Sequence, residues 1–187
     1  YTGDPTQGMN SAQALDFTHK EVRQHKLNLI REQLEKYPQI DGYDLDFMRF
    51  IVLFKTGEGP AKSHLITSFV KSVRQMVDSV SAVRKKNILL SVRVPITVEG
   101  CLEKGIDIRE WHRQGLVDFI SIGAHWRGET ATPIAKFKKD LFQGFKKTIP
   151  VYGSIDDGGY QPDGLCYHCG AEQPDAVEAR DSEPGEV

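Results

Sequence analysis

Apolar side chains recur along the chain in two different periods, and each change of period marks a boundary between elements. Apolar residues spaced three and four apart predict helices around residues 18–37, 65–80, 107–115 and 132–145. Short apolar runs predict strands at residues 42–48, 87–94, 117–124 and 149–155. Because helices and strands alternate in this way, the pattern predicts an α/β fold with parallel strands.

Capping residues sharpen the predicted helix boundaries. The expected caps are Thr18 with Glu21, Asp107 with Glu110, and Thr132 before Pro133. Gly115 is expected to end the short helix that Asp107 begins. Phe145 continues the apolar stripe of the last helix, so we expect that helix to include it.

Four strands with intervening helices fit either a doubly wound sheet or part of an eight-stranded barrel. The chain has neither G-x-G-x-x-G nor a Walker lysine motif, which a nucleotide-binding doubly wound sheet would be expected to carry. Polar residues at the strand ends suit a barrel active site instead. We therefore expect a partial (β/α)8 TIM barrel in one catalytic-type domain over residues 1–187, with its barrel core at 16–157 and a loop and tail at 158–187.

A complete barrel usually needs about 250 residues, so this chain of 187 residues is expected to lack the first strands and the last. The strands present would then expose a long apolar face that the missing strands should cover.

The segment from Asp41 to Phe50 carries the strongest chemical signal. Asp44 and Asp46 stand two residues apart on a predicted strand, so both point to one face, which we expect to be the buried face. Buried carboxylates are costly unless they are paired, hydrated or used. They are therefore candidate catalytic groups, and the alternative is a structural pair that an arginine such as Arg93 neutralises.

Charged residues after the same strands extend the candidate site. Glu129 and Asp156 are candidates for a general acid, although loop glutamates are usually only solvated and Asp156 also suits a turn. Arg49 and Arg93 are expected either to neutralise the acids or to bind a sugar hydroxyl or a uronate.

Aromatic residues and possible metal ligands are further candidates for a binding site. His125 and Trp126 either close the edge of a core strand or form a sugar-stacking platform, and Tyr152 is a further candidate for binding substrate. The segment 166–169 offers two cysteines and a histidine, but no second cluster follows to complete a zinc site. We expect no metal and no cofactor.

The run Asp41-Gly42-Tyr43-Asp44-Leu45-Asp46 resembles the D-G-x-D-x-D strand signature of family 18 glycoside hydrolases, the chitinase-like enzymes. In that family a Glu two positions after the last Asp is the general acid. That position is Met48 here, so the chitinase mechanism is not implied. The longer run 41–49 is similar to D-G-[IVY]-[ED]-L-D-F-M-R in the family 10-like group of glycoside hydrolase-like barrel proteins, which segments 15–23, 91–95 and 115–118 also resemble.

This resemblance implies a glycoside hydrolase that acts on an oligo- or polysaccharide through strand-end carboxylates. Asp46 would be the base or nucleophile, and Asp44 would shift the pKa of Asp46 through its like charge. Glu129 or Asp156 would supply the acid. The alternative is a non-catalytic carbohydrate-binding barrel that has lost its acid, because Met48 takes the place of the catalytic Glu.

Composition narrows the expected partners. The formal net charge is −2 and the pI is about 6.3, so the chain has no general attraction for nucleic acid or an anionic membrane. No run reaches the roughly 18 apolar residues that a membrane span needs. We expect a saccharide partner, with neither nucleic acid nor membrane. Oligomeric state and compartment stay open, although a secreted or periplasmic location suits the full-length protein.

Overall fold

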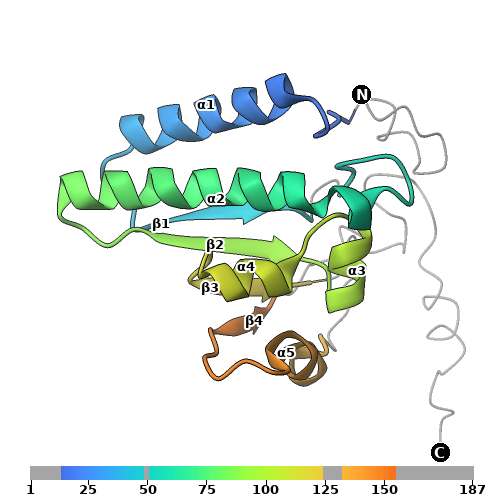
Figure 1. Cartoon of the computed structure of the whole chain (residues 1–187). Coiled ribbons are helices and arrows are strands. Elements are labelled where there is room, and N and C mark those ends of the chain that lie inside the picture. Colours follow the sequence, from blue (N-terminus) through green and yellow to red (C-terminus); the bar gives the residue numbers. More distant parts are fainter. Residues whose placement is uncertain (1–13, 49–50, 124–131, 155–187) are drawn as a thin grey trace, which may run out of the picture.

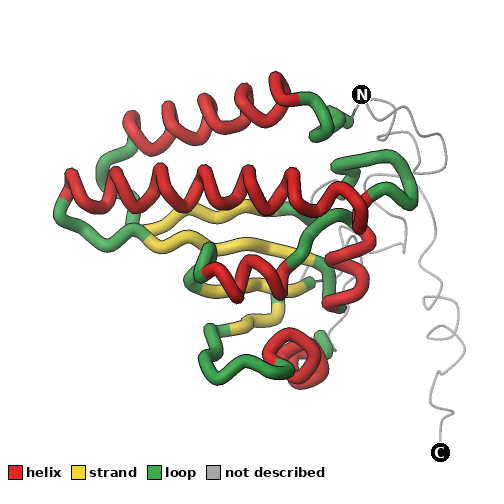
Figure 2. Tube along the Cα trace, in the orientation of Figure 1, coloured by secondary structure: helices red, strands yellow, loops and turns green. Residues whose placement is uncertain are grey.

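The structure is a computed structural model that describes residues 14–48, 51–123 and 132–154. Its elements are α1 (Lys20–Lys36), β1 (Gly42–Asp46), α2 (Gly59–Arg84), β2 (Leu89–Val94), α3 (Val98–Glu103), α4 (Ile108–Gln114), β3 (Phe119–Ile122), α5 (Ile134–Phe142) and β4 (Val151–Gly153). The four strands form one parallel sheet in the order β1-β2-β3-β4 (Figures 1 and 2). The predicted α/β class with parallel strands is therefore confirmed.

The helices cover one face of this sheet. In Figure 1, α2 runs alongside β1 and β2, while α4 and α5 lie beside β3 and β4. The strand residues buried against these helices are all apolar: Leu45, Leu90, Val92, Val94, Ile120, Ile122 and Val151. Because side chains alternate along a strand, the residues between them belong to the opposite face.

We call that opposite face the open face; its residues are Asp44, Asp46, Leu89, Ser91, Arg93, Phe119, Ser121 and Tyr152. Both aspartates and Tyr152 are exposed there. Two expectations are therefore wrong: Asp44 and Asp46 do share a face, but it is not the buried one, and the exposed face is mainly polar rather than apolar. The helices bury only the apolar set of each strand, and no described element packs over the polar set.

Helix α2 supplies much of the core against which the sheet packs. Its apolar residues recur every three or four positions, and those that are buried are Ile66, Phe69, Val70, Val73 and Val77. Gly59, at its start, lies so close to α3 that an added Cβ would be 2.1 Å from the carbonyl oxygen of Glu103. The first turn of α2 therefore packs closely against the end of α3.

The start of α1 differs from the prediction. His19 is the N-cap and makes no side-chain cap hydrogen bond, so the expected capping box of Thr18 and Glu21 is wrong. Asp16 acts one turn earlier, where its carboxylate accepts a hydrogen bond of 2.8 Å from the backbone N–H of Thr18. Burial alone would raise the pKa of Asp16, but the hydrogen bonds from Thr18 outweigh it and lower that pKa.

Helix α4 keeps half of its predicted capping box. Asp107 is the N-cap and accepts a hydrogen bond of 3.0 Å from the backbone N–H of Glu110. The Glu110 side chain does not return to the cap but pairs with Arg113. Gly115 ends the helix with a left-handed φ of 65°, as predicted.

Helix α5 is shorter than predicted at both ends. Its N-cap is Pro133 rather than Thr132, and its last residue is Phe142. Phe145 therefore lies outside the helix, where its ring packs edge-on against His112 with 4.8 Å between the ring centroids. The ring of Phe142, the last helical residue, also packs against His112, so Phe145 continues the apolar spacing by contacting the same histidine from the following turn.

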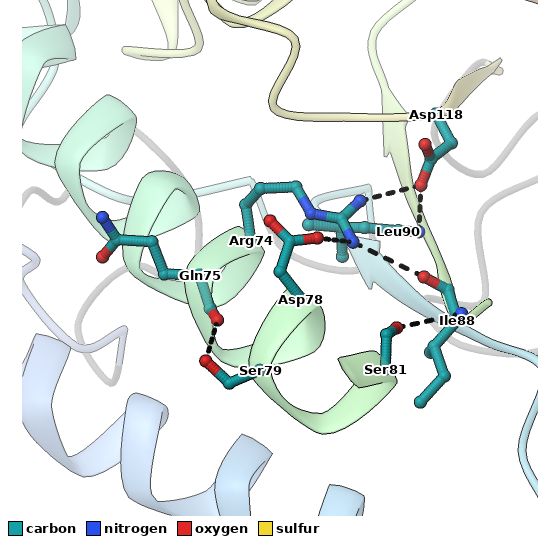
Figure 3. A network of polar contacts seen from close by, with 8 residues as sticks. All are labelled: Arg74, Gln75, Asp78, Ser79, Ser81, Ile88, Leu90 and Asp118. Atoms are coloured by element: carbon teal, nitrogen blue, oxygen red, sulfur yellow. Dashed lines mark hydrogen bonds and ion pairs between the residues drawn. The ribbon is translucent and has the colours of Figure 1, made fainter. Parts of the chain in front are cut away.

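A polar network ties α2 to the N-terminal edge of the sheet (Figure 3). The guanidinium of Arg74 pairs with Asp78 at 2.7 Å and with Asp118 at 2.8 Å. It also donates to the carbonyl oxygen of Ile88, while Asp118 accepts a hydrogen bond of 2.7 Å from the backbone N–H of Leu90. The network thus fixes the entry points of β2 and β3, which sets the register in which both strands continue toward the opposite edge.

Candidate functional site

Register brings the sequence-predicted polar residues of different strands together on the open face. Asp46 is paired with Arg93, Arg93 with Ser121, and Ser121 with Tyr152, so one row crosses all four strands. We call this row the Asp46 row. It lies toward the C-terminal ends of the strands, the edge at which parallel α/β folds carry their active sites.

Asp46 is held by two contacts but stays accessible. One carboxylate oxygen lies 3.4 Å from Nη1 of Arg93, and the other accepts a hydrogen bond of 2.7 Å from the backbone N–H of Met48. The second contact forms because β1 ends at Asp46 and the chain turns there, which makes the strand shorter than the predicted 42–48. The Asp46 side chain is 42% exposed, so it is both oriented and open to a ligand.

Asp44 has a different partner on the same face. Its carboxylate accepts a hydrogen bond from the hydroxyl of Ser91, the residue that faces it on β2. The Ser91 side chain is buried, whereas Asp44 is exposed. Residues two apart on a strand are separated by about 7 Å, so Asp44 and Asp46 can reach one bound molecule together.

Arg93 is the centre of the site. Its Nε donates to Oγ of Ser154 at 3.2 Å, and that hydroxyl in turn donates to the carbonyl oxygen of Ile122 at 3.2 Å. A Cβ at Gly123 would lie 2.1 Å from Oγ of Ser154, so only glycine leaves this hydroxyl in place. Asp46 and Ser154 therefore hold Arg93 from opposite sides, across the width of the sheet.

Ser154 was not among the sequence-predicted site residues, although a signal for it exists. Ser154 stands two residues after Tyr152 in the predicted strand 149–155, so alternation places both on one face. It was overlooked because a serine near a predicted turn has no distinctive chemistry. Its role becomes visible only when the register brings it next to Arg93.

Two aromatic rings occupy the other half of the open face. Tyr152 is 55% exposed, and its ring meets that of Phe119 edge to face, with 5.7 Å between the centroids and an angle of 84°. Phe119 belongs to the row that also contains Asp44 and Ser91. The face therefore has acidic groups on β1 and aromatic groups on β3 and β4, with Arg93 between them.

Met48 takes no part in the open face. It is 4% exposed and belongs to the buried apolar residues. The position at which the resemblance to the chitinase-like enzymes implies a general acid is thus buried and apolar.

Five of the predicted site residues lie outside the described residues: Arg49, His125, Trp126, Glu129 and Asp156. Their roles stay predictions, as does the alternative metal site at 166–169. Within residues 14–48, 51–123 and 132–154, no three His, Cys, Asp or Glu side chains are grouped as a metal site requires. Among the helices of this described part, none has the length and apolar character needed to cross a membrane.

A pocket of about 530 Å³ lies along the outer edge of β1. Asp44 and Asp46 border it, and most of its other lining residues are apolar, among them Leu29 and Ile30 of α1 and Phe47 and Leu53 of the segment after β1. The two acids thus stand where the open face meets this pocket.

Comparison with known proteins yields no match to a family model and none to a curated protein. A function for the chain therefore rests on the geometry of the open face and on the sequence resemblance.

Proposed function

We propose that the chain is part of a glycoside hydrolase-like (β/α)8 barrel that hydrolyses a glycosidic bond in an oligo- or polysaccharide. The sequential order of the four strands supports the barrel, because a doubly wound sheet reverses its order and places helices on both faces. The covering of one face alone by the helices also supports it, since usual right-handed crossovers in sequential order place every helix on the outside.

The observation that carries the proposed chemistry is the pair Asp44 and Asp46 on the open face. Both carboxylates are exposed at the C-terminal half of a parallel strand, and each is oriented by a partner on β2. Glycosidic hydrolysis uses two carboxyl groups beside the scissile bond. Because exposure and orientation are both present, the pair suits catalysis better than a purely structural role.

The proposed roles follow from these contacts. Asp46, which Arg93 and the Met48 N–H hold in one orientation, acts as the base that activates water or as the nucleophile at the anomeric carbon. Asp44 stands about 7 Å away and contacts the same bound saccharide. The acid that protonates the leaving oxygen comes from Glu129 or Asp156.

Substitution of Asp46 tests the proposal. We expect Asp46→Asn to lower turnover about 1,000-fold or more, because it removes the proton acceptor or nucleophile while leaving the shape of the side chain unchanged. The measurement is the release of reducing ends from a panel of neutral polysaccharides, with thermal unfolding recorded to show that the variant folds.

Asp41→Asn is the matched control. Asp41 precedes the same strand at its opposite end and pairs with Lys86 at 2.8 Å on the surface. The Asp41→Asn variant should keep wild-type turnover. Turnover that survives in Asp46→Asn, or that falls equally in both variants, would contradict the proposed mechanism.

The second candidate is a carbohydrate-binding barrel without catalysis, and the buried Met48 favours it. Such a protein would bind a saccharide without releasing reducing ends. Asp46→Asn would then leave its affinity largely unchanged, whereas the hydrolase would lose turnover. Affinity and turnover measured on the same variant therefore distinguish the two candidates.

A further inference from the structure

We propose that Tyr152 and Phe119 form an aromatic subsite that binds one ring of an uncharged oligosaccharide, which lies across the strands toward Asp46. This inference rests on the proposed function, because it takes a saccharide as the ligand. It adds the position of a binding subsite, the direction of the bound chain and its charge.

The two rings have the geometry of a fixed platform. Tyr152 is 55% exposed, which leaves most of a large ring open on the sheet. Phe119 is less exposed and meets that ring edge to face at 5.7 Å and 84°, a favourable arrangement for aromatic pairs. Phe119 thus restricts the Tyr152 ring and leaves one of its faces available to a ligand.

The neighbours of the platform match the other side of a sugar. A pyranose presents C–H groups on its ring face, which pack on an aromatic ring, and hydroxyl groups around its rim, which need donors and acceptors. Beside Tyr152 in the Asp46 row stand the hydroxyl of Ser121 and the guanidinium of Arg93, followed by the Asp46 carboxylate. One row therefore offers both kinds of contact.

The width of the sheet sets the length of the ligand. Neighbouring strands lie about 4.8 Å apart, so the row from β4 to β1 spans about 14 Å, or about three pyranose rings. A chain with one ring on Tyr152 would then place a glycosidic bond near Asp46. The subsite would lie two or three rings from the bond that is cleaved.

The charges of the face favour a saccharide over a protein strand. Covering Asp44, Asp46 and Arg93 with apolar side chains would remove three charges from water, at a cost that few contacts could offset. Two carboxylates and one guanidinium leave one net negative charge among the described residues of the open face. That charge disfavours a uronate and favours an uncharged sugar.

Calorimetric titration of the chain with trisaccharides tests the subsite. The probes are cellotriose, xylotriose and triacetylchitotriose, with trigalacturonate as the anionic comparison. We expect Tyr152→Ala to weaken the tightest uncharged probe about tenfold or more, and Phe119→Leu to weaken it about threefold to tenfold. Tyr152→Phe should stay within about twofold, because it keeps the ring.

Leu89→Ala is the matched control. Leu89 starts β2 on the open face but outside the Asp46 row, and it is 38% exposed, so its removal tests the loss of exposed apolar area other than the two rings. The Leu89→Ala variant should bind the trisaccharides as tightly as the wild type does. Far-ultraviolet circular dichroism and thermal unfolding check that each variant folds, and Tyr152→Leu replaces Tyr152→Ala if that variant is unfolded.

Several outcomes would overturn the subsite: binding that Tyr152→Ala leaves unchanged, tighter binding of trigalacturonate, no binding of any probe, or self-association that Tyr152→Ala abolishes. None of these decides whether Asp46 catalyses, which turnover of Asp46→Asn measures separately. Loss of binding in Tyr152→Ala together with an inactive wild type would support the subsite and overturn the hydrolase.

Discussion

Two arginine–aspartate pairs at opposite edges of the same sheet differ in what their charged atoms contact. At the N-terminal edge, Arg74 and Asp118 lie 2.8 Å apart and bond the backbone of β2 as well as each other (Figure 3). Toward the C-terminal edge, Arg93 and Asp46 lie 3.4 Å apart on the open face, with Ser154 as a further partner of the arginine.

Exposure separates the two arginines but not the two aspartates. The Arg74 side chain is 14% exposed against 23% for Arg93, and the Nε of Arg74 is buried without a hydrogen-bond partner among the described residues. Asp118 and Asp46 are 41% and 42% exposed, so the pairs differ in what these carboxylates bind rather than in how open they are. The same two residue types therefore fasten strands at one edge and present a hydrogen-bonded carboxylate at the other. Under the proposed function, this difference corresponds to the division between stability and activity at the two edges of a parallel α/β barrel.

The largest effect on stability is expected at Arg74. Arg74→Met keeps the aliphatic stem but removes the charge-assisted bonds to Asp118 and Asp78 and the bond to Ile88, and we expect a loss of about 3 kcal/mol in the free energy of unfolding. Urea denaturation measures it. Asp78→Ala is the control, because Asp78 is exposed on the helix surface and its i,i+4 pair contributes about 0.5 kcal/mol or less. Equal losses in both variants would show that the network does not act as a unit.

The same substitution at Arg93 should lower turnover strongly and stability only slightly. We expect Arg93→Met to lower turnover about 100-fold, equivalent to about 2.8 kcal/mol, because Asp46 loses the group that orients it. The free energy of unfolding should change by less than about 1 kcal/mol, since the pair is partly exposed. Turnover and urea denaturation of one preparation measure both. A large loss of stability with normal turnover would make the Arg93 pair structural like the Arg74 pair.

Asp118→Asn separates charge from backbone capping in the N-terminal network. The amide oxygen of Asn can still accept the hydrogen bond from the Leu90 N–H, but it loses the charge that attracts Arg74. We therefore expect a loss of about 1 kcal/mol, smaller than that of Arg74→Met. A loss as large as that of Arg74→Met in urea denaturation would mean that charge accounts for nearly all of the network.

The strands and the shared face of Asp44 and Asp46 were predictable, because both depend on local alternation. Whether that face is buried was not predictable, because this depends on which elements cover the sheet. A strand with alternating side chains has the same sequence pattern whether its polar face is covered or exposed. Phe119 was similarly hidden: within the apolar run 117–124 it looks like any core residue. Its position on the open face follows from the register with Ser91.

The helix caps were likewise predictable only where they depend on local sequence. Asp107 was predicted correctly because its partner, the N–H of Glu110, lies three residues away in the chain. Thr18 was predicted wrongly because Asp16, two residues before it, accepts the Thr18 N–H and fixes the entry to the helix. A capping motif therefore predicts well where no neighbouring carboxylate competes for the same segment.

A third arginine–carboxylate pair gives the smallest effect and a reference for the other two. Glu110 pairs with Arg113 one turn later on α4, with no described backbone group of another element bound by either side chain. The hydrogen bond from Arg113, assisted by one from Gln114, lowers the pKa of Glu110 to about 2 from an ordinary value of 4.5. Because the folded pKa is the lower one, the pair stabilises the fold above pH 4.5, and this contribution is lost as the pH falls toward 2.

We therefore expect Glu110→Gln to lower the free energy of unfolding at pH 7 by less than Asp118→Asn does, since Arg113 is largely exposed and water screens the pair. The difference between variant and wild type should shrink as the pH falls from 4.5 to 2, and it should also shrink in high salt. Urea denaturation at several pH values measures both trends, and Arg113→Gln should behave alike. A difference that grows on acidification would contradict the lowered pKa, and one that matches Arg74→Met in size would remove the distinction between exposed and backbone-bound pairs.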